Sequence, residues 1–330
     1  MINAIADSTT DRLWVPLLTH YCRTAGSVKA DPERMGAHLA YIRPSVRQFL
    51  IAGSTGDGWE MSFETFLDLV RLTRRHDLFD GTRLLFGALR PTTAGVVEWA
   101  QRFEANLEQE GGVAGEYAGL AICPPIDPKA DQAAILTHYE LVLEKTHSPI
   151  AIYQLPQVTG CSIEPETMQA LAKHPRVTMF KDTSGADIVA SAGVMGVTMV
   201  RGAEGNYVRS LAPIGSYDGW LLSTGNAFGP ILRRILELHG QNEHERALRV
   251  SNVLSVMVEM LFEEAAKVPF GNPFSNANRA VDHLWAYGRE WHLKQPPLTV
   301  SGNELPEDLL AAAAELVGHF PALPEAGYLS

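Results

Sequence analysis

One lysine, Lys181, stands where a lysine could do covalent chemistry. It closes an apolar segment, residues 177–181 (VTMFK), whereas the other lysines lie in polar or helical stretches. A buried ammonium loses its hydration, which favours the neutral amine, and a neutral amine attacks a carbonyl to form an imine. The position therefore predicts a Schiff-base lysine. A strand-end lysine paired with the neighbouring Asp182 is the alternative interpretation.

A tyrosine and a glycine-rich loop could complete such a site. Tyr153 ends another apolar segment, so its hydroxyl could move protons beside Lys181; a half-buried core tyrosine is the alternative. The loop 53–58 (GSTGDG) offers backbone N–H groups and the hydroxyls of Ser54 and Thr55, which suit a carboxylate or a phosphate. It lacks the Lys-Ser/Thr pair of a P-loop, and a tight turn between a strand and a helix is the alternative.

The sequence gives little support for metal chemistry. The 11 histidines are scattered, and no HExxH or comparable cluster occurs. His20 alone directly follows an apolar segment, where it could reach the mouth of a pocket. The three cysteines, Cys22, Cys123 and Cys161, are far apart and odd in number, which favours neither a disulfide framework nor a CxxC metal site. We therefore expect no metal.

Eight short apolar segments alternate with amphipathic stretches and would position these residues. Near-continuous apolar runs are typical of parallel strands covered on both faces. We expect strands at residues 14–19, 48–52, 83–87, 119–123, 150–154, 177–181, 198–202 and 220–224. Eight strand–helix units favour a (β/α)8 TIM barrel over an open sheet, with the site at the carboxyl ends of the strands.

The pattern becomes helical after the eighth strand, which suggests how the chain is organised. We expect a loose N-terminal arm over residues 1–12, the barrel over residues 13–240, and a C-terminal helical extension over residues 241–330 that packs on the barrel. Within the extension, residues 275–287 and 307–317 have helical patterns.

Composition and charge narrow the class of protein. Hydrophobic residues make up 46% of the chain and charged residues 20%, as in globular proteins. The net charge of -11 argues against nucleic acid and anionic membranes as partners. The N-terminus has neither a basic region nor a long apolar one, so we expect no signal peptide and, given the cysteine usage, a cytoplasmic location.

Four segments together resemble the dihydrodipicolinate synthase / N-acetylneuraminate lyase family of class I aldolases. They are GSTGD at residues 53–57, YQLP followed by TG within residues 153–160, FKDTSG at residues 180–185, and the segment that ends in Asn at residues 219–226. The likeness spans most of the chain. It implies the barrel, an imine mechanism without a metal, and frequent homotetramers, so we expect a homotetramer or homodimer.

The resemblance implies a role for each matching residue. Lys181 would form the imine, and Tyr153 would transfer protons. Ser54 and Thr55 would bind the keto-acid carboxylate and orient the tyrosine. Glu204 stands near the position where sugar-acid members place a carboxylate against substrate hydroxyls. The remaining expected substrate contacts are Gly53, Gly56, Val158, Gly202 and Asn226.

Several positions depart from the family pattern. Val158 replaces an arginine with which the synthase binds a second carboxylate, and residues 123–126 (CPPI) lack the tyrosine that joins the synthase proton relay. Asp57 replaces the usual glutamate and Gln154 the usual asparagine. These changes argue against authentic dihydrodipicolinate synthase. They favour an aldolase or dehydratase for a 2-keto-3-deoxy sugar acid or another 2-keto acid. We expect specificity to depend on loop residues: Ile126, Val158, Glu204, Tyr207 and Asn226.

The expected mechanism needs no cofactor beyond the covalent imine with Lys181. The carboxylate docks on loop 53–58, Lys181 attacks C2, and Tyr153 moves the proton that expels water. The protonated imine is then an electron sink, so we expect C3–C4 cleavage or loss of a 3-hydroxyl to leave an enamine rather than a bare carbanion. Three other functions stay open: a metal-dependent barrel aldolase, a barrel that binds a keto acid or sugar acid without turnover, and a phosphate-binding barrel isomerase.

Overall fold

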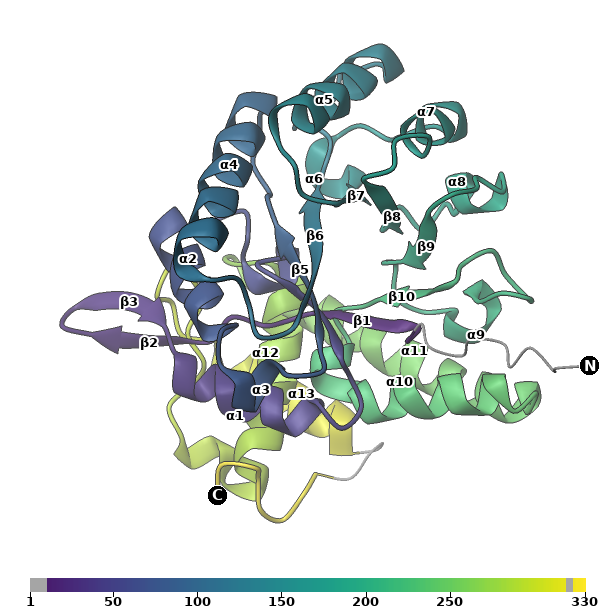
Figure 1. Cartoon of the computed structure of the whole chain (residues 1–330). Helices are drawn as coiled ribbons and strands as arrows, with labels where there is room; N and C mark the ends of the chain where they lie inside the picture. The colour runs from purple at the N-terminus through teal and green to yellow at the C-terminus, as the bar shows by residue number, and fades with distance from the viewer. Residues whose placement is uncertain (1–10, 319–322) are drawn as a thin grey trace, which may run out of the picture.

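The computed structural model describes residues 11–318 and 323–330 of the chain. Eight parallel strands pair into a closed barrel in the order β1-β10-β9-β8-β7-β6-β5-β4 (Figure 1). These strands are β1 (Leu13–Pro16), β4 (Gln48–Ile51), β5 (Arg83–Gly87), β6 (Glu116–Ile122), β7 (Ile150–Gln154), β8 (Val177–Asp182), β9 (Thr198–Arg201) and β10 (Gly219–Leu221). The predicted (β/α)8 TIM barrel is therefore confirmed.

The predicted strands are all present, but some predictions run too far toward the carboxyl end. The segment 14–19 leaves the sheet after Pro16, and the segment 220–224 leaves it after Leu221. The apolar pattern continues because the residues that follow stay buried in the loops: Leu17, Leu18 and Leu222. The antiparallel hairpin of β2 (Tyr21–Thr24) and β3 (Ser27–Ala30) was not predicted.

A packed floor fills the barrel interior with one side chain from each strand: Trp14, Leu50, Leu85, Ala121, Ala151, Met179, Val200 and Leu221. Side chains two residues further along a strand point to the same face. Tyr153 therefore lies above Ala151 on β7, and Lys181 above Met179 on β8. The alternation places both polar groups inside the barrel at the carboxyl ends of their strands.

Helices follow the strands and cover the outside of the barrel. Ser62, Thr92 and Asp131 cap α2, α4 and α5, each accepting a hydrogen bond from the backbone N–H three residues further on. The helices up to the end of the barrel are α1 (Pro32–Ile42), η1 (Ser54–Gly56), α2 (Phe63–Leu72), α3 (His76–Phe79), α4 (Thr93–Glu110), α5 (Gln132–Lys145), α6 (Pro156–Thr159), α7 (Pro165–Leu171), α8 (Ile188–Ser191), α9 (Tyr207–Ser210) and α10 (Gly225–Gly240).

The chain after α10 forms α11 (His244–Ala266), α12 (Pro273–Tyr287), η2 (Gly288–Leu293) and α13 (Glu307–Gly318), which confirms the two helices predicted in this part. Figure 1 shows these helices gathered beside α10 on one side of the barrel. Ser275 of α12 donates a hydrogen bond of 2.9 Å to the carbonyl of Thr55, so α12 supports the loop after β4. The boundaries at residues 13, 240 and 241 stay a prediction, and residues 1–10 of the expected arm lie outside the described residues.

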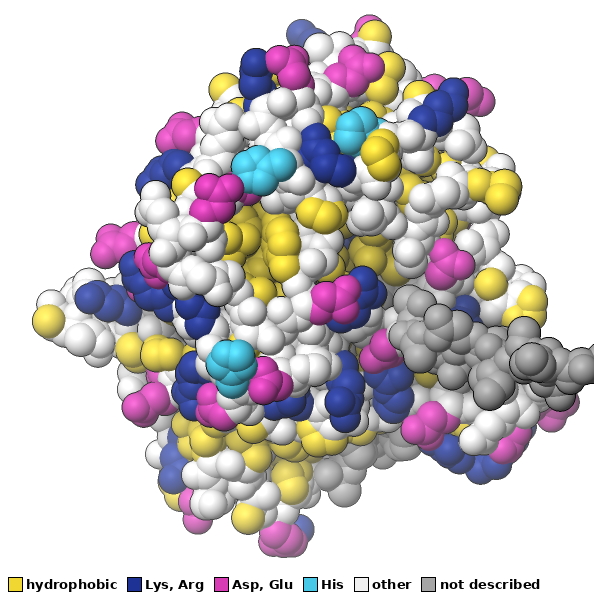
Figure 2. All heavy atoms as spheres, in the orientation of Figure 1, with side chains coloured by type: hydrophobic (Ala, Val, Ile, Leu, Met, Phe, Trp, Pro, Cys, Tyr) yellow, Lys and Arg dark blue, Asp and Glu magenta, His cyan; other side chains and the backbone are white. Residues whose placement is uncertain are grey.

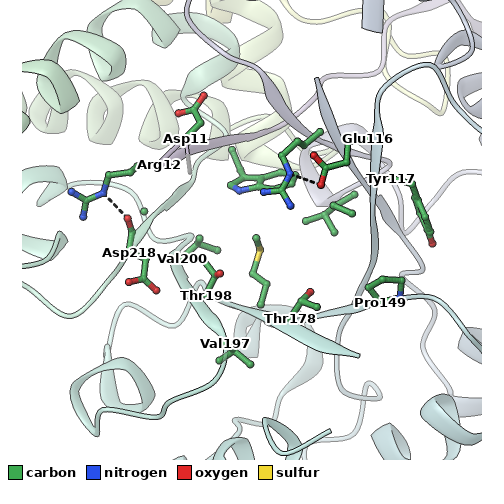
Figure 3. Close-up of a pocket in the computed structure, with 16 residues that line it drawn as sticks. Asp11, Arg12, Glu116, Tyr117, Pro149, Thr178, Val197, Thr198, Val200 and Asp218 are labelled. Atoms are coloured by element: carbon green, nitrogen blue, oxygen red, sulfur yellow. Dashed lines mark hydrogen bonds and ion pairs between the residues drawn. The ribbon is translucent and has the colours of Figure 1, made fainter. Parts of the chain in front are cut away.

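A cavity of about 580 Å³ opens at the amino ends of the strands, at the opposite end of the barrel from Lys181 (Figure 3). Its arginines are bound to the protein: Arg83 Nε lies 3.0 Å from Glu116 Oε1, and Arg12 Nε donates to the backbone carbonyl of Asp218 at 2.6 Å. In barrel enzymes this end serves stability rather than chemistry. Figure 2 shows one face of the molecule with acidic and basic side chains interspersed. Among the described residues, no helix is long and apolar enough to cross a membrane.

Candidate functional site

A second cavity, of about 280 Å³, lies at the carboxyl ends of the strands. Tyr153 and Lys181 form part of its wall, together with Gly202 and Ser223, which follow β9 and β10. Ser54 and Thr55 of η1 line it from the loop after β4. Segments far apart in the sequence thus meet where barrel enzymes carry their chemistry.

Lys181 is buried, with 4% of its surface exposed. It lies opposite Tyr153 in the β7–β8 pairing, and its Nζ lies 3.8 Å from the centre of the tyrosine ring. At this distance the electron-rich face of the ring attracts an ammonium. The lysine is therefore held against the tyrosine with its amine in the cavity.

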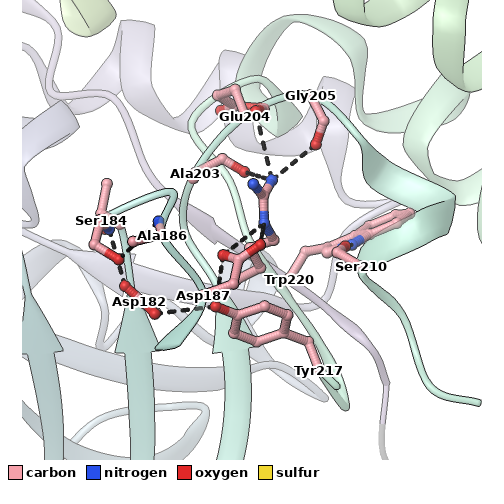
Figure 4. Close-up of polar contacts among 12 residues, drawn as sticks. Asp182, Ser184, Ala186, Asp187, Ala203, Glu204, Gly205, Ser210, Tyr217 and Trp220 are labelled. Atoms are coloured by element: carbon pink, nitrogen blue, oxygen red, sulfur yellow. Dashed lines mark hydrogen bonds and ion pairs between the residues drawn. The ribbon is translucent and has the colours of Figure 1, made fainter. Parts of the chain in front are cut away.

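The carboxylate of Asp182, the residue after Lys181, is hydrogen-bonded to groups other than the lysine. Its Oδ1 accepts hydrogen bonds from Gln154 Nε2 at 3.1 Å and from the backbone N–H of Ser184 at 2.9 Å. Its Oδ2 lies 3.0 Å from the hydroxyl of Tyr217 (Figure 4). Within the described part of the chain, Lys181 and Asp182 form no ion pair, so the alternative interpretation of Lys181 is not supported.

Arg201 at the end of β9 holds the loop that follows it, in which Figure 4 labels Ala203, Glu204 and Gly205. Its guanidinium donates to the carbonyls of Ala203 at 2.6 Å and Gly205 at 2.8 Å, and its Nε pairs with Asp187 at 3.2 Å. The Tyr217 hydroxyl lies 2.8 Å from the same Asp187 carboxylate. These partly buried contacts connect the segments after β8 and β9, which form part of the cavity wall.

Ser54 links the tyrosine to the glycine-rich loop. The Tyr153 hydroxyl donates to Ser54 Oγ at 3.3 Å, a contact of the kind that the family resemblance implies for an oriented tyrosine. The indole N–H of Trp59 donates to the same oxygen at 3.0 Å. Sequence reasoning missed Trp59. The available signal was an aromatic N–H donor in the loop that carries the predicted binding hydroxyls.

The backbone of the loop leaves no room for side chains at one of its glycines. A Cβ on Gly58 would lie 1.9 Å from the carbonyl oxygen of Ala52. Asp57 adopts a left-handed conformation with φ of 59°. Its carboxylate accepts a hydrogen bond of 2.9 Å from the Tyr21 hydroxyl and forms a buried ion pair with Arg279 of α12. Asp57 therefore anchors the loop to α12.

Glu204 lines the cavity and is bound by three protein donors. One carboxylate oxygen accepts from Ser223 Oγ at 2.8 Å and from the backbone N–H of Thr224 at 3.0 Å. The other accepts from the Tyr207 hydroxyl at 3.1 Å. Burial raises the pKa of the Glu204 carboxyl, and these hydrogen bonds act against that rise.

The expected site residues fall into two groups. Those that line the cavity are Ser54, Thr55, Tyr153, Val158, Lys181, Gly202 and Glu204. Gly53, Gly56 and Asn226 were also expected to contact substrate, but they do not line the cavity. Asn226 is fully buried and joins the start of α10 to the end of β1, since it accepts from the N–H of Leu18 at 3.0 Å and donates to the carbonyl of Pro16 at 2.9 Å. Asn226 therefore stabilises the barrel instead of contacting a ligand in the cavity.

His20 lies in a different cluster, outside this cavity. Ligand atoms of His20, His38 and Asp282 lie within 4.8 Å of one another. However, His38 Nδ1 and the Tyr328 hydroxyl each lie 2.6 Å from Asp282 Oδ1, and Arg34 pairs with Oδ2. Burial disfavours the carboxylate, but Arg34 and His38 hold the pKa of Asp282 well below its usual range. With its carboxylate occupied by protein donors, the group serves as an ion network rather than a metal site.

The fold and the lysine-centred cavity define a barrel of the aldolase type. The chain belongs to the dihydrodipicolinate synthetase family, whose model matches residues 36–275, and it is thus an enzyme of the lyase class. It is 27% identical over 210 residues to the 4-hydroxy-tetrahydrodipicolinate synthase of Xanthomonas campestris, covering 62% of this chain and 66% of that relative. It is 28% identical over 228 residues to the synthase of Corynebacterium diphtheriae, covering 68% and 71%.

Solved structures share the fold at lower identity. A prophage protein of the dihydrodipicolinic acid synthase family from E. coli K12, in complex with pyruvate, has a TM-score of 0.74 and 18% identity, covering 93% of this chain and 97% of that one. The protein CdNal from Clostridium difficile, in complex with mannosamine, has a TM-score of 0.73 and 17% identity, covering 94% and 100%. At these identities the likeness carries the fold alone.

Proposed function

We propose that the protein is a Schiff-base-forming lyase that cleaves or dehydrates a pyruvate-derived 2-keto acid through an imine on Lys181. The observation that carries this proposal is the buried amine of Lys181, held 3.8 Å from the Tyr153 ring. It faces a cavity that also holds the hydroxyl of Ser54. Amine, phenol and hydroxyl are the groups that imine formation on a keto acid requires.

Each group has a defined part in the proposed reaction. The keto-acid carboxylate accepts hydrogen bonds at the loop of Ser54 and Thr55. Lys181 attacks C2, and Tyr153 supplies the proton with which the C2 oxygen leaves as water. The C3–C4 bond then breaks, its electron pair moves into the protonated imine, and the 4-hydroxyl loses its proton as the aldehyde forms. Protonation of the enamine at C3 and hydrolysis release pyruvate and the amine.

The imine itself is the electron sink in this scheme, so we propose no metal and no organic cofactor. If the imine instead loses a C3 proton before cleavage, the resulting enamine expels the 4-hydroxyl as water, and the enzyme is a dehydratase. The expected loss of a 3-hydroxyl does not balance, because the double bond that forms in this step is C3=C4. A 2-keto-3-deoxy sugar acid is the second candidate substrate. The carboxylate of Glu204 lines the cavity, but we rank this candidate second because the carboxylate oxygens already accept three hydrogen bonds from the protein. Authentic synthase activity is disfavoured, since Val158 stands where a second substrate carboxylate would need an arginine.

We further propose a homotetramer or homodimer, as the family resemblance implies, and a cytoplasmic location, which the cysteine usage favours. Light scattering tests the assembly directly. A monomer at micromolar concentration would contradict it, without bearing on the chemistry of the cavity.

Incubation with pyruvate followed by sodium borohydride tests the proposed function. We expect a stable pyruvyl adduct that peptide mapping by mass spectrometry locates on Lys181. Lys181→Ala should abolish the adduct while keeping the far-UV circular dichroism and the thermal melt. Lys267→Ala, which removes an exposed lysine paired with Glu264, should trap as the wild type does. No adduct with pyruvate or with longer 2-keto acids would favour a barrel that binds its ligand without turnover.

A further inference from the structure

We infer that the cavity selects an uncharged, ring-bearing aldehyde, so that the substrate is a 4-hydroxy-2-keto acid with an apolar ring on C4. This inference rests on the proposed imine function and concerns the part of the substrate beyond C3. Three observations support it: the charge of the cavity wall, the apolar side chains on one side of the cavity, and the hydrogen bonds that its polar side chains already make with the protein.

The charge of the wall argues against an anionic tail. Lys181 is the only cationic side chain among the described residues that line the cavity. In the imine its nitrogen is used for catalysis, which leaves no cation for a second carboxylate. Glu204 stands in the same wall and would repel one. An anion without a counter-ion in a partly buried cavity is disfavoured by its lost hydration.

One side of the cavity is apolar and aromatic. Phe262 of α11 and Phe274 of α12 meet edge to face, with ring centres 4.8 Å apart and planes at 80°. Leu155 and Val158, which follow β7, line the same cavity. Phe274 and Val158 are each 40% exposed although they are large apolar side chains. Exposed apolar side chains around a concave site are typical of a surface that a ligand covers.

Three polar side chains of the wall, those of Glu204, Gln157 and Asn272, are already engaged with the protein. The carboxylate of Glu204 accepts three hydrogen bonds, one of them from Ser223. Gln157 Nε2 donates to the carbonyl of Thr183 at 2.8 Å. Asn272 Oδ1 accepts the backbone N–H of Phe274 at 2.9 Å, as the cap of α12. A tail with several hydroxyl groups would compete with these contacts or leave hydroxyls unpaired, at a cost.

One hydroxyl of the wall is different. Thr183 Oγ1 is buried and has no hydrogen-bond partner among the described residues. It lies beside the lysine, since a Cβ built on Gly202 would be 2.6 Å from Thr183 Oγ1 and 2.8 Å from Lys181 Cε. An aldol of pyruvate carries one hydroxyl close to the imine, at C4. Thr183 therefore suits the C4 oxygen, and the apolar side suits the ring attached to C4.

The reaction balances without an additional reactant. In cleavage the C3–C4 bond gives its electrons to the protonated imine, and the C4 hydroxyl becomes the aldehyde as its proton leaves. The products are pyruvate and the ring aldehyde. In the reverse direction the enamine of pyruvate attacks that aldehyde.

Competing condensations test the inference. The enzyme is given pyruvate with benzaldehyde, with glyceraldehyde, or with succinic semialdehyde, and kcat/KM for the aldehyde is measured. We expect benzaldehyde to exceed both others by at least about tenfold, the discrimination an apolar pocket can supply. Preference for glyceraldehyde or for the semialdehyde would overturn the inference, as would the absence of any benzaldehyde product.

Borohydride trapping with pyruvate is run in parallel, because it does not depend on the aldehyde. If the pyruvate adduct forms but the enzyme prefers glyceraldehyde or succinic semialdehyde, the inference of a ring-bearing substrate is refuted and the proposed imine function still holds. Absence of the adduct refutes the imine function. The two failures are therefore distinguishable.

Variants locate the preference in the structure. Phe274→Ala should lower the ratio of kcat/KM for benzaldehyde to that for glyceraldehyde by about tenfold. Phe270→Ala is the matched control, because Phe270 lies in the segment between α11 and α12 and does not line the cavity. Thr183→Val should lower kcat/KM for every aldehyde while the pyruvate adduct still forms. Equal ratios in the Phe270 and Phe274 variants would contradict the assignment.

Discussion

The indole N–H of Trp59 and the hydroxyl of Tyr153 both donate to Ser54 Oγ, at 3.0 Å and 3.3 Å. With two donors on its oxygen, Ser54 keeps its own proton free to donate. An indole can only donate, so Trp59 fixes the direction of this hydrogen-bond chain. The Ser54 proton then points toward the place where the proposed mechanism puts the keto-acid carboxylate.

Trp59→Phe keeps an aromatic side chain and removes the N–H. We expect KM for pyruvate to rise about five- to tenfold, the equivalent of one hydrogen bond of about 1 kcal/mol, with a smaller change in kcat. Solvent deuterium exchange at C3 of pyruvate, followed by NMR, measures both quantities. Trp220→Phe is the control, because it removes an indole N–H that donates to Ser210 at 3.2 Å, a serine that does not line the cavity. Equal changes in both variants would assign Trp59 a packing role only.

Tyr153→Phe should act on kcat rather than KM. The ring that contacts Lys181 Nζ is kept, while the hydroxyl that moves the proton is lost. We expect C3 exchange to slow by roughly two to four orders of magnitude, the usual range for a lost general acid–base. A change of less than about threefold would make Tyr153 a packing residue.

Gly202→Ala tests the space that the lysine needs. The new Cβ would lie 2.8 Å from Lys181 Cε and 2.6 Å from Thr183 Oγ1, closer than van der Waals contact allows. We expect the lysine to be displaced and the rate of pyruvate trapping to fall roughly 100-fold, the effect of an error of about 1 Å in placement. The control Gly240→Ala adds a Cβ that meets no atom within 4 Å, and it should trap at the wild-type rate. Unchanged trapping in Gly202→Ala would show that the lysine can rearrange.

Much of the fold and part of the site could be predicted because each depends on local pattern. Apolar runs mark the strands, and the period of two places Tyr153 and Lys181 on the inner face of the barrel. The hydrogen-bond and ion-pair partners of the polar side chains could not be predicted, because they depend on packing between distant segments. Asn226 bonds to β1 instead of lining the cavity, and Asp57 pairs with Arg279, a residue of α12. The aromatic side of the cavity was missed for the same reason, because Phe262 and Phe274 belong to helices that follow the barrel.

A buried histidine outside the cavity provides a test of stability against pH. His138 Nδ1 lies 2.8 Å from Thr93 Oγ1, and its Nε2 lies 3.1 Å from the carbonyl of Cys123. Burial lowers the pKa of His138 to about 4, while the hydrogen bond to the carbonyl acts against this. A histidine in the unfolded chain has a pKa of about 6.5. Between these values the unfolded state binds the proton more readily, so the free energy of unfolding falls as the pH drops.

We therefore expect His138 to remove roughly 2 to 3 kcal/mol from the free energy of unfolding between pH 7.5 and pH 4.5. Guanidinium unfolding at both pH values measures the loss. Other groups also titrate in this range, so the loss of unfolding free energy is compared between the wild type and His138→Gln. The loss in His138→Gln should be smaller by roughly 2 to 3 kcal/mol. His76→Gln, at a side chain that is 78% exposed, should lose as much stability as the wild type. If His138→Gln lost as much as well, His138 would be able to accept a proton within the fold at little cost.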